Sequence, residues 1–150
     1  MEMETEMEQV TTTDDQVLTF SLAGVDMALP VDEIKEVLVD GSFEEIPLAP
    51  DFITGLFTLR GQIVTGIDLR KRFSMEERSG DDDYSIIIVE TGAETIGFIV
   101  DEVGDVMPAG QEKIEELPAN MRSNWQQWEA NIIREEETIR ILLNTHLLIN

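Results

Sequence analysis

The 150-residue chain carries 32 acidic residues against 10 basic ones, giving a formal net charge of −22 at pH 7. This charge repels phosphate backbones and anionic lipid headgroups, so we expect no nucleic-acid partner. The absence of cysteine excludes disulfides and thiolate catalysis, and no apolar run is long enough for membrane insertion, so a cytoplasmic location is expected. A hydrophobic content of 42% predicts one domain, or two small barrels, with a sizeable buried core.

The first fifteen residues, Met1–Asp15, alternate Met or Thr with Glu before a run of Thr, and they contain no aromatic residue. Such a segment buries too little apolar surface to offset the entropy lost on ordering. We therefore expect a disordered acidic tail over residues 1–15 and a folded region over residues 16–150.

The folded region begins with a predicted β-hairpin. Apolar and polar residues alternate over Gln16–Leu22 and again over Val25–Leu29, with a turn at Ala23-Gly24 between them. Pro30 ends the hairpin. The next stretch, Val31–Leu38, fits either a helical turn or a further strand.

A second hairpin is predicted around Arg60-Gly61, which is flanked on both sides by β-branched and apolar residues. Gly61 can adopt the positive φ that a two-residue turn requires, so this turn should expose Arg60. Asp68 follows the second strand and can cap a short helix over Leu69–Phe73. The basic residues of that helix complement the negative end of its dipole.

The short polar stretch Ser79–Asp83 is the expected boundary between barrel one, about residues 16–79, and barrel two, about residues 80–150. Its adjacent aspartates lack the spaced ligands of a calcium loop, so a solvated linker is favoured over a metal site. The largely apolar run Tyr84–Val89 that follows is typical of a strand buried on both faces.

The sequence then repeats itself. Val31–Leu38 matches Val100–Met107 at nearly every position, and each copy follows a hairpin. Leu56–Arg72 similarly matches Ile132–Leu148, including the residue that caps the helix. Two matches in the same order predict a duplicated five-strand unit that is too small to be stable alone. We therefore expect an all-β fold of two packed five-stranded barrels with short helices.

The sequence offers no convincing catalytic set. The only histidine, His146, lies in the last predicted helical turn without a recognisable partner, which favours a surface residue over a general base. Trp125 and Trp128 are expected on one apolar face of a helix over Asn120–Trp128 rather than in a ligand cage. Because neither a phosphate-binding glycine loop nor a metal motif is present, we expect no catalytic residue, no cofactor and no metal site.

Five short motifs occur in a specific order along the folded region: Phe20-Ser21-Leu22, Ile34-Lys35-Glu36-Val37, Gly55 with Leu59-Arg60-Gly61, Ile67-Asp68-Leu69-Arg70 and Val100-Asp101-Glu102-Val103. In this order they resemble the CheW family of chemotaxis coupling proteins, and the resemblance covers Gln16 to Leu148. Thr58 departs from the family, which usually has asparagine there. Glu135-Glu136-Glu137 departs as well, because it occupies the second copy of the Arg60 turn.

The resemblance implies that both barrels are SH3-like. It also implies an adaptor that joins the cytoplasmic tip of a methyl-accepting chemoreceptor to the regulatory domain of a CheA-type histidine kinase. Two alternatives within the adaptor class are a coupling module of another receptor array, such as a pilus-type array, and a free-standing relative of the kinase regulatory domain. A small acidic enzyme is the hypothesis from another class.

The resemblance also predicts where the partners bind. It makes Glu36 and Arg60 a paired acid and base near the partner surface, and it places the helical hairpin of the receptor in a groove between the barrels. The segments that begin at Val31 and Val100 should face each other across that groove. The expected partner-binding residues are Ile34, Glu36, Val37, Gly55, Thr58, Arg60, Val100, Val103 and Val106.

Overall fold

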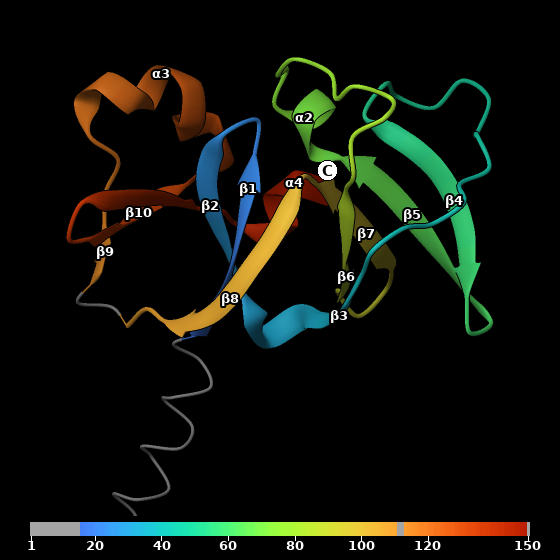
Figure 1. Ribbon diagram of the computed structural model, residues 1–150, viewed down its shortest axis with the longest axis horizontal. Coiled ribbons are helices and arrows are strands. Elements are labelled where there is room, and N and C mark those ends of the chain that lie inside the picture. The colour runs from blue at the N-terminus through green and yellow to red at the C-terminus, as the bar shows by residue number, and fades with distance from the viewer. Residues whose placement is uncertain (1–15, 111–112, 150) are drawn as a thin grey trace, which may run out of the picture.

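A computed structural model describes residues 16–110 and 113–149, so the expected tail over residues 1–15 lies outside the described part of the chain. Its strands form two sheets that lie side by side, with short helices around them (Figure 1). In chain order the strands are β1 (Gln16–Leu22), β2 (Val25–Pro30), β3 (Ile34–Leu38), β4 (Ile53–Leu59), β5 (Gln62–Asp68), β6 (Ser85–Glu90), β7 (Thr95–Val100), β8 (Glu102–Pro108), β9 (Ile114–Glu115), β10 (Asn131–Glu135) and β11 (Thr138–Leu142). The helices are η1 (Val31–Glu33), α2 (Leu69–Arg72), η3 (Ala119–Met121), α3 (Arg122–Trp125), η4 (Gln126–Trp128) and α4 (Thr145–Ile149).

Each sheet takes strands from both halves of the chain. The first sheet has the order β8-β1-β2-β11-β10-β9, and the second has the order β3-β6-β7-β5-β4. This corrects the predicted division into barrels over residues 16–79 and 80–150. The β1–β2 hairpin joins strands of the second half of the chain through the parallel pair of β2 with β11. The β6–β7 hairpin joins strands of the first half through the parallel pair of β7 with β5. Parallel pairing requires a long crossover, which local strand and turn signals do not reveal.

The predicted duplication is visible in this exchange. In the first sheet Ala28 pairs with Leu142, and at the equivalent place in the second sheet Gly97 pairs with Gly66. Each sheet therefore combines the first two strands of one copy with the last three strands of the other. The first sheet gains the two-residue strand β9 at its edge, so the predicted five strands describe the second sheet alone.

A central core lies between the sheets and contains residues of both. Ile87 and Val89 of β6 face this core. Ile86 and Ile88 of the same strand point to the opposite face, where they pack with Val64 in a smaller cluster built from the second sheet alone. The prediction of a strand buried on both faces is confirmed. The strand β6 therefore joins the packing within one sheet to the packing between the two.

Two segments differ from a single regular element. Val31–Leu38 contains both forms that its sequence allowed, because η1 is followed directly by β3. The helix expected over Asn120–Trp128 is divided into η3, α3 and η4. Its two tryptophans still share a contact, since the rings of Trp125 and Trp128 meet the ring of Phe73 at 5.0 and 5.2 Å between centroids.

Candidate partner-binding surfaces

The β4–β5 hairpin places Arg60 at one end of the second sheet. Arg60 and Gly61 have φ angles of 50° and 84°, as a two-residue turn of this kind requires, which confirms the predicted turn. The Arg60 guanidinium donates to both carboxylate oxygens of Glu36 on β3, with 3.0 Å between Nη2 and Oε1. Because β3 and β4 are opposite edges of this sheet, the ion pair connects the two edges.

The Glu36–Arg60 pair lies in water. The Arg60 side chain is 68% exposed and that of Glu36 is 28% exposed. The hydrogen bond from Arg60 lowers the pKa of Glu36, and the same bond raises the pKa of Arg60, so both groups stay charged near neutral pH. Because water screens an exposed ion pair, the Glu36–Arg60 pair contributes little to stability, and its charged groups remain available to a partner.

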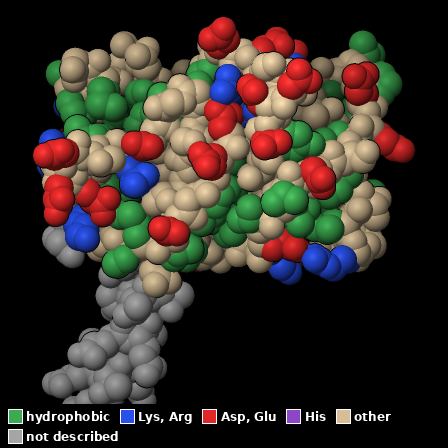
Figure 2. All heavy atoms as spheres, in the orientation of Figure 1, with side chains coloured by type: hydrophobic (Ala, Val, Ile, Leu, Met, Phe, Trp, Pro, Cys, Tyr) green, Lys and Arg blue, Asp and Glu red, His purple; other side chains and the backbone are tan. Residues whose placement is uncertain are grey.

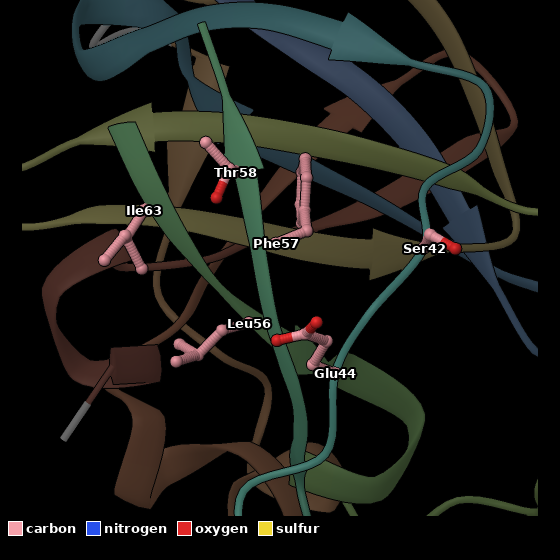
Figure 3. A pocket seen from close by; sticks show the side chains of 6 residues that line it. All are labelled: Ser42, Glu44, Leu56, Phe57, Thr58 and Ile63. Atoms are coloured by element: carbon pink, nitrogen blue, oxygen red, sulfur yellow. The ribbon is translucent and has the colours of Figure 1, made fainter. Parts of the chain in front are cut away.

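A cavity of about 350 Å³ lies beside this hairpin (Figure 3). Leu56 and Ile63 point to one side of the hairpin and Phe57 to the other, where its ring meets that of Phe43 at 4.9 Å. Ile63 is exposed and directly opposite Thr58. Sequence reasoning missed Ile63, although the two-residue turn fixes the register that gives Ile63 and Thr58 a common face. We call Glu36, Thr58, Arg60 and Ile63 the Arg60 surface.

Gly55 is not part of any surface, so its prediction as a partner contact is corrected. It is buried, and a Cβ atom at this position would lie 2.3 Å from the carbonyl oxygen of Glu44. That close approach lets Glu44 and Leu56 exchange backbone hydrogen bonds of 2.7 and 2.9 Å. The chain that leaves β3 is thereby brought back onto β4, next to the Arg60 surface.

All five apolar residues expected in the groove lie on the sheet faces that surround the central core. Directly paired strand residues point to the same face. Val37 pairs with Ile87 and Val106 pairs with Leu18, and both partners belong to the central core. Yet Val37 is 38% exposed and Val106 is 53% exposed. They extend the central core to the surface at the edge strands β3 and β8.

Ile34 and Val103 are half-buried and pack against the central core. Val100 is fully buried, because β7 is flanked by β6 and β5, and the prediction that it lines an exposed strip is wrong. We call Ile34, Val37, Val103 and Val106 the inner-face strip. On the side of the molecule that carries β8, hydrophobic side chains are exposed among acidic ones (Figure 2).

A third cluster, which sequence reasoning missed, surrounds Asp101 between β7 and β8. Arg70 donates to the Asp101 carboxylate from Nε and Nη2 at 3.0 and 2.5 Å, and Arg78 donates from Nε and Nη2 at 3.2 and 2.7 Å. The backbone N–H of Ala23 donates to it at 2.7 Å. The side chains of Arg70, Arg78 and Asp101 are only 15%, 10% and 20% exposed. We call this cluster the Asp101 clamp.

The predicted helix caps hold the residues that follow them in place. Asp68 accepts a hydrogen bond of 3.0 Å from the backbone N–H of Arg70, which confirms the cap of α2. Asn144 accepts one of 3.1 Å from the N–H of His146 and repeats this cap at α4. His146 Nε2 lies 3.2 Å from Glu33 Oε2, so the histidine has an acidic neighbour on η1.

The Asp101 clamp predicts acid-sensitive stability. Burial alone would raise the pKa of Asp101, but hydrogen bonds from Arg70, the Ala23 amide and Arg78 outweigh it and lower the pKa from 3.8 to about 2. A depressed folded-state pKa means that the stabilisation is present above the unfolded-state value and is lost as the pH falls through the folded-state value. We expect about 1 to 2 kcal/mol to disappear between about pH 4 and pH 2, allowing for screening by water.

Urea unfolding measures this contribution as the difference between the wild type and Asp101→Asn. The difference in unfolding free energy should be largest near pH 6 and should shrink toward about pH 2, where the wild-type carboxyl is protonated as well. A difference that stays constant across this range would mean that the Asp101 charge does not stabilise the fold.

The part of the chain that the structure describes holds no group of three or more His, Cys, Asp or Glu residues arranged to bind a metal ion. No helix within residues 16–110 or 113–149 is long and apolar enough to cross a membrane. The described surfaces instead consist of an exposed ion pair with an apolar neighbour, and an apolar strip between acidic residues. Surfaces of this composition are typical of sites that bind other proteins.

Comparison with known proteins adds to this geometry. Residues 16–150 match the family described as the CheW-like domain. Chemotaxis protein CheW of Bacillus subtilis (strain 168) is 25% identical over 138 residues, which cover 92% of this chain and 88% of the relative. Chemotaxis protein CheW of Treponema pallidum (strain Nichols) is 27% identical over 137 residues, covering 89% and 81%. The crystal structure of the scaffolding protein TtCheW from Thermoanaerobacter tengcongensis superposes with a TM-score of 0.80 at 34% identity, over 90% of this chain and 92% of that one.

Proposed function

The chain belongs to the family of CheW-like domains, and from this premise we propose that it joins methyl-accepting chemoreceptors to a CheA-type histidine kinase in the cytoplasm. Its two sheets are the two SH3-like barrels of this fold, and the chain is a chemotaxis coupling adaptor in a family of scaffold proteins. The observation that carries the proposal is the presence of two separate exposed surfaces on one chain, the Arg60 surface and the inner-face strip. An adaptor needs two such surfaces in order to hold two partners at once.

The Arg60 surface is the proposed site for the regulatory domain of the kinase. It lies entirely on the second sheet and combines a charged pair, Glu36 and Arg60, with the exposed side chain of Ile63. The nearby cavity of about 350 Å³ can accept an apolar side chain of the partner. Arg60 is a favourable anchor because its planar guanidinium can bind a partner carboxylate through two hydrogen bonds.

The inner-face strip is the proposed site for the receptor tip. Val37 and Val106 occupy equivalent positions in the two copies and are exposed on the two edge strands β3 and β8. An apolar helix face packs well against branched side chains at such a position. Acidic neighbours at the rim, including Glu102 and Asp105, would favour a receptor segment with basic residues beside its apolar face.

Binding of purified components tests the proposed function. The full chain should bind both the kinase regulatory domain and a receptor cytoplasmic fragment, and the two ligands together should form a ternary complex. Pull-down from cells identifies the array, because a pilus-type receptor in place of a chemotaxis receptor would support the alternative coupling module. A chain that binds neither component would contradict the adaptor proposal.

The inner-face strip is tested by Val106→Asp. Because Val106 is 53% exposed, a carboxylate there should leave the melting temperature nearly unchanged, but it should weaken receptor binding by about tenfold or more. Ile139→Asp is the matched control, since Ile139 is similarly exposed, at 42%, at the far hairpin of the same sheet. Receptor affinity that is equal for the two variants, measured by calorimetry, would remove Val106 from the binding surface.

Ile34→Ala separates packing from binding at the half-buried part of the strip. Ile34 packs against the central core, so its truncation should lower the unfolding free energy by about 1 to 2 kcal/mol, less than a fully buried isoleucine would. It should also weaken receptor binding. A large loss of melting temperature with unchanged receptor affinity would assign Ile34 to the core alone.

A further inference from the structure

Along the described chain the backbone passes between the two sheets twice. It leaves the first sheet after β2 and enters the second at β3 through η1, and it returns from β7 to β8 through a single residue, Asp101. These two crossovers are equivalent in the sequence repeat, in which Asp32 corresponds to Asp101. The two crossovers differ in the side-chain contacts that hold them in place.

At the η1 crossover, an exposed histidine, His146, lies beside Glu33. At the other crossover the equivalent of His146 is Arg70, and it belongs to the half-buried Asp101 clamp. The Asp101 carboxylate joins α2 and Arg78, on the second sheet's side, to the β1–β2 turn of the first sheet through Ala23. Charge-assisted hydrogen bonds at low exposure are stronger than a screened surface pair. The junction at Asp101 is therefore the firmer of the two.

The short helix α2 reinforces the same junction. Arg72 donates from Nε to the carbonyl oxygen of Leu148 on α4 at 2.9 Å. Its guanidinium carbon also lies 4.1 Å from the ring centre of Phe52 and 4.8 Å from that of Trp128. The residues of α2 thus contact both the crossover at Asp101 and the helix that ends the described chain.

We propose that Asp101 is a positioning residue for receptor binding, because it fixes the angle between the two sheets. The proposal rests on the receptor site proposed above. One half of the inner-face strip, Ile34 and Val37, lies on β3, and the other half lies on β8, which begins directly after Asp101. A change in the angle between the sheets alters the spacing of these halves. The Arg60 surface lies on the second sheet alone, and a change in the angle between the sheets therefore leaves it intact.

The variant Asp101→Asn removes the charge and one strong acceptor while nearly preserving the shape of the side chain. It leaves Arg70 and Arg78 without their shared anion, and the arginines will regain water by moving outward. The junction should then loosen while the two sheets remain folded. The expected result is a receptor Kd weakened by about tenfold and a kinase-domain Kd changed by less than about twofold.

The distance between the sheets provides a readout that lost stability alone would not change. The chain contains no cysteine, so Glu94→Cys in the β6–β7 turn of the second sheet and Glu136→Cys in the β10–β11 turn of the first give two unique sites for spin labels. The distribution of distances between the labels should broaden or shift in Asp101→Asn, measured well below its melting temperature. Ile132→Val, a mild change in the buried core, is the control for lost stability and should keep both the distance and the receptor affinity.

Two outcomes would overturn the proposal: an unchanged receptor affinity in folded Asp101→Asn, and an equal loss of affinity for both partners. If Asp101→Asn does not fold, Arg78→Gln carries the test instead. It removes one of the two arginines and leaves Arg70 paired with Asp101, so the expected loss of receptor affinity is in the same direction but smaller, again with kinase binding unchanged. A wild-type chain that binds no receptor would refute the proposed function instead, so the two failures are distinguishable.

Discussion

Cleavage of the backbone within Ser79–Asp83 should leave two fragments that stay associated as one folded particle and do not fold apart. The cut falls in an exposed stretch between α2 and β6, where it breaks no strand. After cleavage, one fragment contains β1 to β5 and the other contains β6 to β11. Each sheet still needs strands from both fragments, and so does the central core.

The reason is the exchange of hairpins. Without the second fragment, the β1–β2 hairpin loses β8 on one side and β11 on the other, and β3 and β5 lose β6 and β7. Fragments of this size bury too little surface to fold once their sheets are incomplete. The expected effect is therefore complete unfolding of each isolated fragment.

A protease site inserted between Ser79 and Asp83 allows the test. The nicked chain should elute with the uncut chain in size-exclusion chromatography at low concentration and should separate only in denaturant. Each purified fragment should lack the β-sheet signal in circular dichroism, and mixing the two should restore it. Nicked halves that separate in dilute buffer and remain folded would contradict the exchanged arrangement.

Local features of this fold could be predicted from the sequence because nearby residues determine them. The turn at Arg60-Gly61 follows from the conformational freedom of glycine, and the cap at Asp68 follows from a side chain placed two residues before the amide that it binds. The alternation of apolar and polar residues that predicted the first hairpin is likewise a local feature. The same patterns indicated a duplication, but they could not show that the copies exchange hairpins.

The features that were missed depend on residues far apart in the chain. Nothing in the sequence links Arg70 and Arg78 to Asp101, since only the fold brings α2 to the β7–β8 crossover. That crossover also explains the error at Val100. Val100 ends an interior strand and is buried, whereas Val103 and Val106 lie beyond Asp101 on an edge strand with an open side. A repeated apolar pattern cannot distinguish an interior strand from an edge strand.

Reversing the charge of Arg60 should abolish kinase activation without unfolding the protein. Arg60 is 68% exposed at a hairpin tip, so Arg60→Glu should keep the melting temperature within a few degrees of the wild type. At the partner surface, the new carboxylate lies beside Glu36 and repels any acidic group that Arg60 anchored. We expect binding of the kinase regulatory domain to weaken by about a hundredfold or more.

Two matched variants show whether the position or the charge is responsible. Arg134 forms an ion pair of similar exposure with Glu115 on the first sheet, with 3.1 Å between Nε and Oε2, so Arg134→Glu makes the same change of charge away from the Arg60 surface. It should leave kinase binding unchanged. The double variant Glu36→Arg with Arg60→Glu restores an ion pair but not the anchor, so it should remain defective.

The most direct measurement is receptor-dependent kinase activity in a mixture of receptor fragment, kinase and this chain. The proposal predicts strong activation by the wild type and by Arg134→Glu, and close to none by folded Arg60→Glu. Normal activation by folded Arg60→Glu would contradict the assignment of the kinase site. The absence of activation by the wild type would contradict the coupling function itself.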